Sequence, residues 1–171
     1  KKEESEKARK EKQRMANATK KMRKTKDDMN DITWYRDKSS PRFTNINGFF
    51  CYIGNKDKSN PWLRIRIQYV ADDWLFIEKY IINVDGKKYT ISEQKSGEIE
   101  TDNGSGDIWE WLDRTVSNDE YEIIKAIAHG NKVKIRYVGR QYHKDKTISG
   151  RQKQALRNII DAYEALGGTM K

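Results

Sequence analysis

The sequence is poor in the residues from which many functional sites are built, with one cysteine, two histidines and two prolines among its 171 residues. A single cysteine, Cys51, excludes an intramolecular disulfide framework and a zinc site made of cysteines. No apolar run approaches the roughly 18 to 20 residues that cross a bilayer as a helix. We expect any signal peptide or lipid-attachment site to lie upstream of Lys1.

The motifs of common catalytic sites are also missing. The sequence contains no glycine-rich phosphate loop, no G-x-S-x-G elbow and no H-x-H or H-E-x-x-H pair. Cys51 lies in the apolar run FFCYIG, and no pattern places His129 or His143 beside it, so we expect a packed side chain. We therefore predict that the protein is not an enzyme and holds no cofactor and no metal ion.

The net charge of +9 suggests a polyanionic partner, but the excess is unevenly distributed. Residues 1–31 hold 12 Lys or Arg and 7 Asp or Glu, whereas the other 140 residues hold 23 and 19. Most of the basicity per residue therefore belongs to the first segment. This distribution weakens the case for a folded domain that binds polyanions.

The first 32 residues have the composition of a charged helix. Residues 1–31 contain no glycine, proline or aromatic residue, and their Lys, Glu, Arg, Ala and Met favour helix. A thin heptad seam passes through Ala8, Met15, Met22 and Met29. Such small and flexible side chains permit dimerisation without requiring it. We predict a charged helical extension, or stalk, over residues 1–32.

The stretch from residue 61 to residue 91 has the pattern of antiparallel strands. In WLRIRIQYV, apolar and polar or amphipathic positions alternate, with Leu63, Ile65, Ile67 and Tyr69 on one face and Trp62, Arg64, Arg66 and Gln68 on the other. Asp85-Gly86 is a strong signal for a two-residue hairpin turn. Pairing outward from this turn predicts the register Ile82–Tyr89, Tyr80–Ile91, Asn83–Lys88 and Ile81–Thr90.

Two capping boxes mark helix starts in the C-terminal part of the chain. The box S-N-D-E at 117–120 opens a predicted helix over about 118–129, with Gly130 as its C-cap. The box S-G-R-Q at 149–152 opens a second helix, ended by Gly167-Gly168. Its apolar stripe consists of Ala155, Leu156, Ile159, Ile160, Tyr163 and Leu166.

Further strands are predicted at 97–101, 108–113 and 132–138, followed by a turn at Gly139-Arg140 and a strand containing Tyr142. The pattern predicts an α+β fold, mainly antiparallel β, with a sandwich-like or strongly curved sheet. Two helices pack near the C-terminus, and the long helical extension precedes them. We predict a single β-rich globular domain over residues 33–171.

The candidate ligand residues are aromatic and basic. Trp62 shares a strand face with Arg64 and Arg66, as in sheets that stack nucleic-acid bases, but an ordinary solvated strand face has the same pattern. The acids that follow, Asp72 and Asp73, favour the solvated face. Trp109 and Trp111 share a face of DIWEWLD and have two possible roles, stacking on sugar rings or, as we favour, packing in the core. The complete candidate surface is Trp109, Trp111, Tyr35, Trp62, Arg64 and Arg66.

A run of strands from Trp62 to Ile91 is followed by a capped helix, a strand and a final amphipathic helix, and a stalk-like segment precedes them. This order of elements resembles that of small β-sandwich domains of uncharacterised bacterial or phage proteins. The resemblance covers the layout of residues 33–168. Many of those proteins are lipid-anchored outside the cell through a charged stalk. The resemblance implies a lipoprotein-like protein displayed at the bacterial envelope, attached to the membrane only through an anchor upstream of Lys1.

Three functional hypotheses follow from these observations. The leading one is a non-enzymatic interaction domain at the bacterial envelope that binds a protein or another envelope component. The second is a cytoplasmic nucleic-acid binder that uses the basic segment 1–31 with Arg64 and Arg66. The third is a carbohydrate-directed cell-wall domain that uses Trp109 or Trp111.

Overall fold

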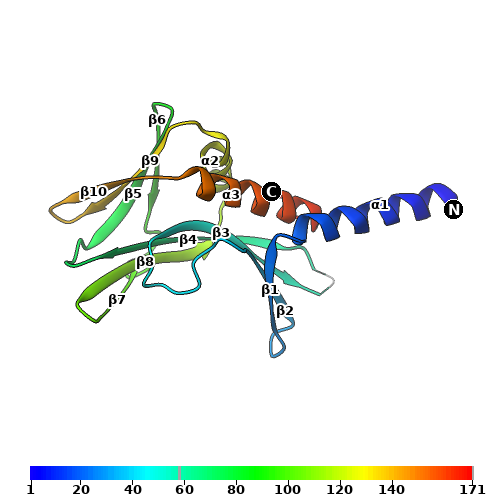
Figure 1. Cartoon of the computed structure of the whole chain (residues 1–171), viewed down its shortest axis with the longest axis horizontal. Coiled ribbons are helices and arrows are strands. Elements are labelled where there is room, and N and C mark those ends of the chain that lie inside the picture. The colour runs from blue at the N-terminus through cyan, green and yellow to red at the C-terminus, as the bar shows by residue number, and fades with distance from the viewer. Residues whose placement is uncertain (58, 171) are drawn as a thin grey trace.

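The computed structural model describes residues 1–57 and 59–170, which form three helices and ten strands arranged in two antiparallel sheets (Figure 1). The helices are α1 (Lys2–Thr19), α2 (Asn118–His129) and α3 (Gly150–Ala165). The predicted α+β class, mainly antiparallel β with two helices near the C-terminus and one at the N-terminus, is confirmed.

The larger sheet has six strands in the order β1-β2-β3-β4-β8-β7. They are β1 (Met22–Asp27), β2 (Ile32–Asp37), β3 (Gly48–Lys56), β4 (Trp62–Ala71), β7 (Glu100–Gly104) and β8 (Asp107–Thr115). The smaller sheet has the order β10-β9-β5-β6. Its strands are β5 (Ile77–Val84), β6 (Lys87–Ser92), β9 (Val133–Gly139) and β10 (His143–Thr147). The chain therefore leaves the larger sheet after β4 and returns with the β7–β8 hairpin, whose β8 pairs with β4.

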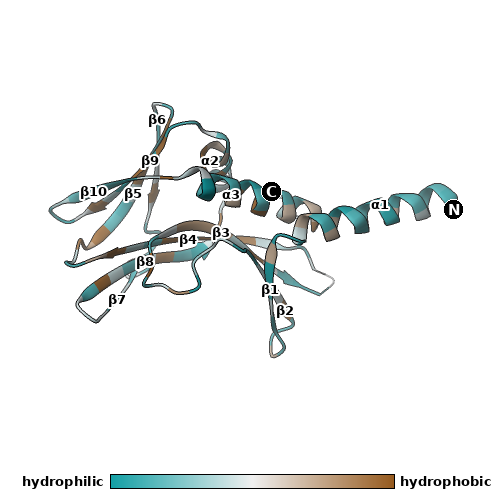
Figure 2. Ribbon diagram, viewed as in Figure 1, coloured by the Kyte–Doolittle hydropathy of each residue, from teal (hydrophilic) through white to brown (hydrophobic). Residues whose placement is uncertain are grey.

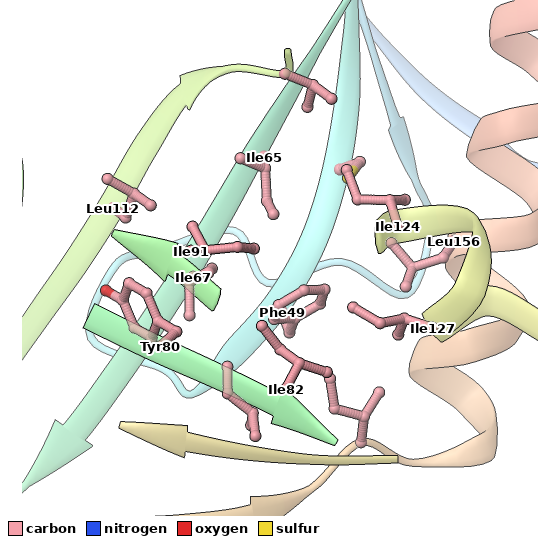
Figure 3. Close-up of a cluster of buried hydrophobic side chains, with 14 of the residues drawn as sticks. Phe49, Ile65, Ile67, Tyr80, Ile82, Ile91, Leu112, Ile124, Ile127 and Leu156 are labelled. Atoms are coloured by element: carbon pink, nitrogen blue, oxygen red, sulfur yellow. The ribbon is translucent and has the colours of Figure 1, made fainter. Parts of the chain in front are cut away.

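The hydrophobic core lies between the inner faces of the two sheets and under α2 and α3 (Figures 1 and 3). Figure 3 shows side chains from both sheets and both helices pointing toward one another, among them Ile65, Ile67, Leu112, Tyr80, Ile82, Ile91, Ile124, Ile127 and Leu156. All of them are buried. Removing this apolar surface from water is the main favourable term for folding.

The alternation in β4 and the hairpin register are confirmed. Leu63, Ile65 and Ile67 are buried, while the intervening Arg64 and Arg66 stay partly exposed. The β5–β6 hairpin has the predicted pairs Ile82–Tyr89, Tyr80–Ile91, Asn83–Lys88 and Ile81–Thr90.

Both capping boxes are also confirmed. In α2 the Ser117 side chain accepts a hydrogen bond from the backbone of Glu120, whose own side chain accepts one from the Ser117 backbone. Ser149 and Gln152 make the same reciprocal pair in α3. These bonds satisfy backbone donors that a first helical turn leaves unpaired.

The predicted helix over the first 32 residues is too long, because the helix ends at Thr19 and residues 22–27 form strand β1. Met22 is buried in the core at the start of β1, and Met29 is exposed in the turn that follows. The heptad seam therefore does not continue beyond α1. The folded body includes β1, paired with β2 along its whole length.

Local turn chemistry explains this correction. The Asp27 carboxylate accepts hydrogen bonds from the backbone N–H groups of Met29 and Asn30 and from the Asn30 side chain. Asp31 then adopts a positive φ of 55°. Aspartate and asparagine favour such turns because their side chains bond to nearby backbone. The tight turn lets residues 22–27 pair with β2, and this tertiary pairing outweighs the helical propensity of the segment.

Two later strands differ from their predicted positions. The segment predicted at 97–101 is strand β7 at Glu100–Gly104, which turns at Ser105 and Gly106, both with positive φ, into β8. Strand β10 begins at His143, so Tyr142 precedes it and is exposed. In both cases the hairpin exists and its boundaries are shifted.

Two buried polar side chains on the inner side of β8 hold that strand in place. The Glu110 carboxylate accepts hydrogen bonds from the backbone N–H groups of residues 75–77, where the chain crosses from one sheet to the other. Arg114 forms ion pairs with Glu98 and with Glu120 at the start of α2. Buried charges of this kind require such partners, so β8 is fixed against both the crossover and α2.

Candidate functional site

The outer face of the six-stranded sheet points away from the core, on the lower side of Figure 1. Because side chains alternate along a strand, the neighbours of buried Cys51, Ile65 and Leu112 point outward there. Strand pairing arranges the outward residues in rows that run across the sheet. We call this surface the aromatic face. Its central residues are Trp34, Arg36, Tyr52, Trp62, Arg64, Arg66, Trp109, Trp111 and Asp113.

One row contains Trp34, Gly54 and Trp62 on β2, β3 and β4. The two indole rings meet edge to face over the glycine, with centroids 5.6 Å apart and planes at 83°. A Cβ atom at residue 54 would lie 2.3 Å from the Trp62 ring and 2.9 Å from the Trp34 ring. The absence of a side chain at Gly54 therefore makes this tryptophan pair possible. Both indoles remain partly exposed.

The next row is centred on Tyr52, which is 4% exposed. Its ring centroid lies 5.6 Å from that of Trp34. Three guanidinium groups lie near the ring, those of Arg36 at 4.4 Å, Arg66 at 5.5 Å and Arg64 at 6.0 Å from the centroid. Arginine stacks favourably on aromatic rings, so the tyrosine both packs under these cations and orients them.

Asp113 on β8 joins the tyrosine to two of the arginines. The Tyr52 hydroxyl donates to its carboxylate at 2.6 Å, and the Nε atoms of Arg64 and Arg66 donate at 3.1 and 3.0 Å. Burial acts to raise the pKa of Asp113, but hydrogen bonds from Tyr52 and Arg66 and the charges of both arginines outweigh it, so the pKa is lowered. Burial, followed by the bond to Asp113, raises the pKa of Tyr52. Asp113 therefore stays ionised and holds the two arginines in place.

Arg36 is positioned differently from the other arginines. Its guanidinium lies over Tyr52 and at 6.0 Å from the Trp34 ring, and burial lowers its pKa. Among the described residues it has no hydrogen-bond or ion-pair partner, whereas Arg64 and Arg66 both bond to Asp113. The N–H donors of Arg36 are thus held in a defined place and remain available to a binding partner.

The other side of the face carries Trp109 and Trp111 on β8. Glu100 and Asp102 of β7 are their direct neighbours across the strand pair. The Trp109 ring lies against Gly104, and its buried indole N–H has no hydrogen-bond partner among the described residues. Neither tryptophan makes a ring–ring or cation–π contact within the described part of the chain.

Charge separates across the aromatic face. The outward positions of β1–β4 form a basic half, whose charged residues within the described chain are Arg23, Arg36, Lys56, Arg64, Arg66 and Asp27. The outward positions of β7 and β8 form an acidic half, whose charged residues in the same described chain are Glu100, Asp102, Asp107 and Asp113. Each half contains two partly exposed tryptophans.

A loop over residues 38–47 lies across part of this face. The Gln68 side chain, fully buried on the outer side of β4, donates to the backbone oxygens of Phe43 and Ile46 at 2.9 and 2.7 Å. The side chains of Phe43 and Ile46 are themselves 66% and 47% exposed. The loop therefore adds two exposed apolar side chains near the boundary between the two halves.

The structure brings five of the six predicted ligand residues together on the aromatic face, namely Trp62, Arg64, Arg66, Trp109 and Trp111. Trp109 and Trp111 lie on the outer face rather than in the core, because Ile108, Glu110 and Leu112 take the inner positions of β8. Tyr35 is on the opposite side of its strand, where it packs against the core.

Sequence reasoning missed the centre of the face. Trp34 and Arg36, the neighbours of Tyr35, point outward instead, and both sides of β2 are partly buried, so its burial gives no alternation. Tyr52 lies in the apolar run FFCYIG, whose composition predicts a strand that is buried on both sides. The alternation of Trp34 with Arg36 in TWYRD repeats that of Trp62 with Arg64 and is a local signal for this face, but it does not show that the two strands belong to neighbouring parts of one sheet.

Other groups of reactive side chains are less organised. Cys51 is fully buried in β3, and burial raises the pKa of its thiol, so it is packed as expected. A cleft of about 560 Å³ opens between the β4–β5 crossover and the β9–β10 hairpin, lined among others by Asp72, Trp74 and His143. Among the described residues no cluster of three or more His, Cys, Asp or Glu has a geometry that could hold a metal ion.

No protein family, curated protein or solved structure matches this chain. In the described chain, none of the three helices combines the length and apolar character that crossing a bilayer requires.

Proposed function

We propose that this protein is a non-enzymatic interaction domain, that its binding surface is the aromatic face, and that its partner is a polypeptide. The support is the composition of that face: four partly exposed tryptophans together with arginines held on a buried tyrosine. Tryptophan, tyrosine and arginine are the residues most enriched at the energetic centres of protein interfaces.

The outer face of the smaller sheet provides a contrast. Its outward side chains include four cations, Lys79, Lys88, Lys134 and Arg136, and Asp145 is paired with Arg136. Within the described chain it has no outward Trp, Tyr or Phe. Basic side chains therefore occur on the outer faces of both sheets, and the aromatic rings single out the larger sheet.

The separation of charge argues for a polypeptide over a polyanion. A nucleic acid laid across the whole face would meet the carboxylates of Glu100, Asp102 and Asp107. A polypeptide carries side chains of both signs and can complement both halves. Helix α1, the predicted nucleic-acid element, holds six Lys or Arg and four Glu. The nucleic-acid alternative stays a prediction, tested by salt-dependent retention of random DNA or RNA.

The carbohydrate alternative has one favourable observation, the pair Trp109 and Trp111 beside Glu100 and Asp102. Partly exposed indoles offer faces to sugar rings, and carboxylates accept hydrogen bonds from hydroxyl groups. Quenching of tryptophan fluorescence by cell-wall sugar fragments, lost in the Trp109→Ala and Trp111→Ala variants, is the result this alternative requires.

We also propose that α1 is a spacer and that the domain is displayed at the bacterial envelope. The helix is exposed over nearly its whole length and hydrophilic, and it projects from the folded body (Figures 1 and 2). Fractionation of the producing cells tests this placement. Protein that resists extraction from the envelope and is accessible to added protease agrees with it, whereas protein found only in the cytoplasm contradicts it.

Photocrosslinking tests the proposed binding surface. A photoreactive phenylalanine analogue replaces Trp62 or Trp111 in the protein as its own cells produce it. The control variant carries the analogue at Ile81, which is partly exposed on the outer face of the smaller sheet. We expect light-dependent adducts from both positions on the aromatic face and none from the control.

The chemistry of the adduct decides the partner class. An adduct whose proteolytic fragments join the labelled segment to a peptide of a second polypeptide chain supports the proposal. An adduct whose mass falls only after nuclease or glycosidase treatment contradicts a polypeptide partner and supports one of the alternatives. Equal yields from residues 62, 111 and 81 overturn the aromatic face as the binding surface.

A further inference from the structure

We infer that a second copy of this chain binds the aromatic face, in a two-fold dimer that places the basic half of each copy on the acidic half of the other. The inference rests on the proposed function, because it assigns a partner to the same surface. It is argued from the charge pattern, the available donors and acceptors, and the area of the face.

The charge pattern is self-complementary. In a two-fold interface the same patch is used by both copies, and a residue i that meets residue j in one direction meets it again in the other. A face with one basic half and one acidic half satisfies this condition when the axis lies in the plane of the face, between the two groups of charges and at right angles to the line that joins them. The strand registers place the basic residues toward the Trp62 end of β4 and the acidic residues toward its Ala71 end, so this axis crosses the strands diagonally near Asp113, where β8 meets Arg64 and Arg66. The outer face of the smaller sheet has no comparable acidic half among its described residues.

Each half has charged groups that its own copy leaves unused. In the basic half, the Arg36 guanidinium has no hydrogen-bond partner among the described residues, and Lys56 is exposed. In the acidic half, the side chains of Glu100 and Asp107 are exposed, and among the described residues their carboxylates have no hydrogen-bond or ion-pair partner. The two unpaired cations of one copy can therefore pair with the two unpaired carboxylates of the other.

The face is large enough for a specific dimer. With the axis near Asp113, four strands lie on one side of it and two on the other, so the second copy covers about four strands. Four strands spaced about 4.8 Å apart, each about eight residues long at about 3.3 Å per residue, project to roughly 500 Å². Side chains that project from the sheet, and the loop that carries Phe43 and Ile46, increase the surface area that a partner covers. A standard interface buries about 800 Å² on each side. The four tryptophans and the two loop side chains supply the apolar contact that charges alone do not provide.

Paired charge reversals test this arrangement. One variant, R36E/K56E, replaces two cations of the basic half by carboxylates and brings its net charge from +4 to 0. The other, E100K/D107K, replaces two carboxylates of the acidic half by lysines and brings its net charge from −4 to 0. A control variant, K88E/K134E, reverses two lysines on the outer face of the smaller sheet. Sedimentation velocity gives the oligomeric state of the full chain and of each variant over a range of concentrations. Circular dichroism shows that each variant is folded.

We expect the wild-type chain and the control variant to dimerise. Each reversal variant alone should dimerise with a Kd raised roughly tenfold or more, because the attraction between the halves is lost and the substituted side chains face charges of their own sign. An equimolar mixture of the two reversal variants should restore the dimer, since opposite halves meet again. Raising the salt to about 1 M, where the screening length falls to about 3 Å, should weaken the wild-type dimer.

Three results would overturn the inference: a wild-type chain that stays monomeric at every concentration, a dimer unaffected by either reversal, or reversal variants that remain monomeric when mixed. None of them bears on the photocrosslinking result. A foreign peptide crosslinked at residues 62 and 111 of a monomeric chain leaves the proposed function intact and removes only the second copy as partner.

Discussion

Trp34 and Trp62 lie on the same sheet face as Trp109 and Trp111, yet the two pairs have different surroundings. The first pair is packed against Tyr52 and lies among arginines. The second pair lies beside Glu100 and Asp102 and, among the described residues, contacts no other ring. The same residue type is thus part of a packed aromatic cluster in one half and a separate partly exposed side chain in the other.

Topology causes this difference. The β7–β8 hairpin follows the excursion into the smaller sheet and pairs with β4 only through tertiary structure. Its acids therefore become neighbours of arginines that are distant in the sequence. The net charge of the whole chain, +9, does not reveal a face divided between two signs. Substitutions in the two halves should accordingly have unequal effects.

The largest difference is expected between Tyr52→Ala and Trp111→Ala. Tyr52 is buried under three guanidinium groups, so its removal should lower the free energy of unfolding by about 3 to 5 kcal/mol. Trp111 is partly exposed, and its removal should cost about 1 to 2 kcal/mol. Urea unfolding measures both values. A loss for Trp111→Ala equal to that for Tyr52→Ala would contradict the difference between the halves.

The link between the halves is tested by Asp113→Asn. Loss of the charged hydrogen bonds to Arg64 and Arg66 should cost about 1.5 to 3 kcal/mol near neutral pH. Because the pKa of Asp113 is lowered on folding, its stabilisation is present above the ordinary carboxyl value of about 3.9 and is lost as the pH falls through the lowered value.

The difference in unfolding free energy between wild type and Asp113→Asn should therefore shrink steadily as the pH falls below about 4. Urea unfolding at a series of pH values measures it. A difference that stays constant across the acid range would show that Asp113 contributes only through its shape.

A smaller effect on the free energy of unfolding is expected when alanine replaces Gly54 or Gly104, the glycines that contact the tryptophan rings. Gly54→Ala forces Trp34 and Trp62 apart and should cost about 1 to 3 kcal/mol, with a changed near-ultraviolet circular dichroism signal. The matched control is Gly104→Ala, whose Cβ would lie 3.3 Å from the Trp109 ring and should cost less than about 1 kcal/mol. Equal losses would mean that the two pairs are equally packed.

The smallest effect is expected from Arg36→Lys. Lysine keeps the charge but lacks the planar group that stacks on Tyr52, so the loss should be about 0.5 to 1 kcal/mol. Lys88→Arg on the smaller sheet serves as the control and should be neutral. An unchanged unfolding free energy for Arg36→Lys would argue against a stacking role for the guanidinium.

Local signals predicted the elements that local chemistry determines. The alternation in β4, the Asp85-Gly86 turn and the two capping boxes depend on residues within a few positions of one another, and all were confirmed. The predicted helix to residue 32 was wrong, because the helical propensity of residues 22–27 is overridden by pairing with β2.

The candidate face was only partly predictable for the same reason. Period-two alternation tells which residues of one strand share a side, so Trp62, Arg64 and Arg66 were grouped correctly. It does not tell which strands are neighbours, so neither Asp113 beside Arg66 nor Trp34 beside Trp62 could be inferred. Tyr35 was named as a candidate and Trp34 was not; both sides of β2 carry aromatic residues, so its pattern gives no preferred face.

The division of the aromatic face by charge can be measured directly with fluorine-labelled tryptophan and charged paramagnetic probes. In nuclear magnetic resonance spectra of the labelled chain at low salt, an anionic probe should broaden Trp34 and Trp62 more than Trp109 and Trp111. A cationic probe should reverse that order, and high salt should remove the difference. The same order of broadening with both probes would contradict a face with one basic and one acidic half.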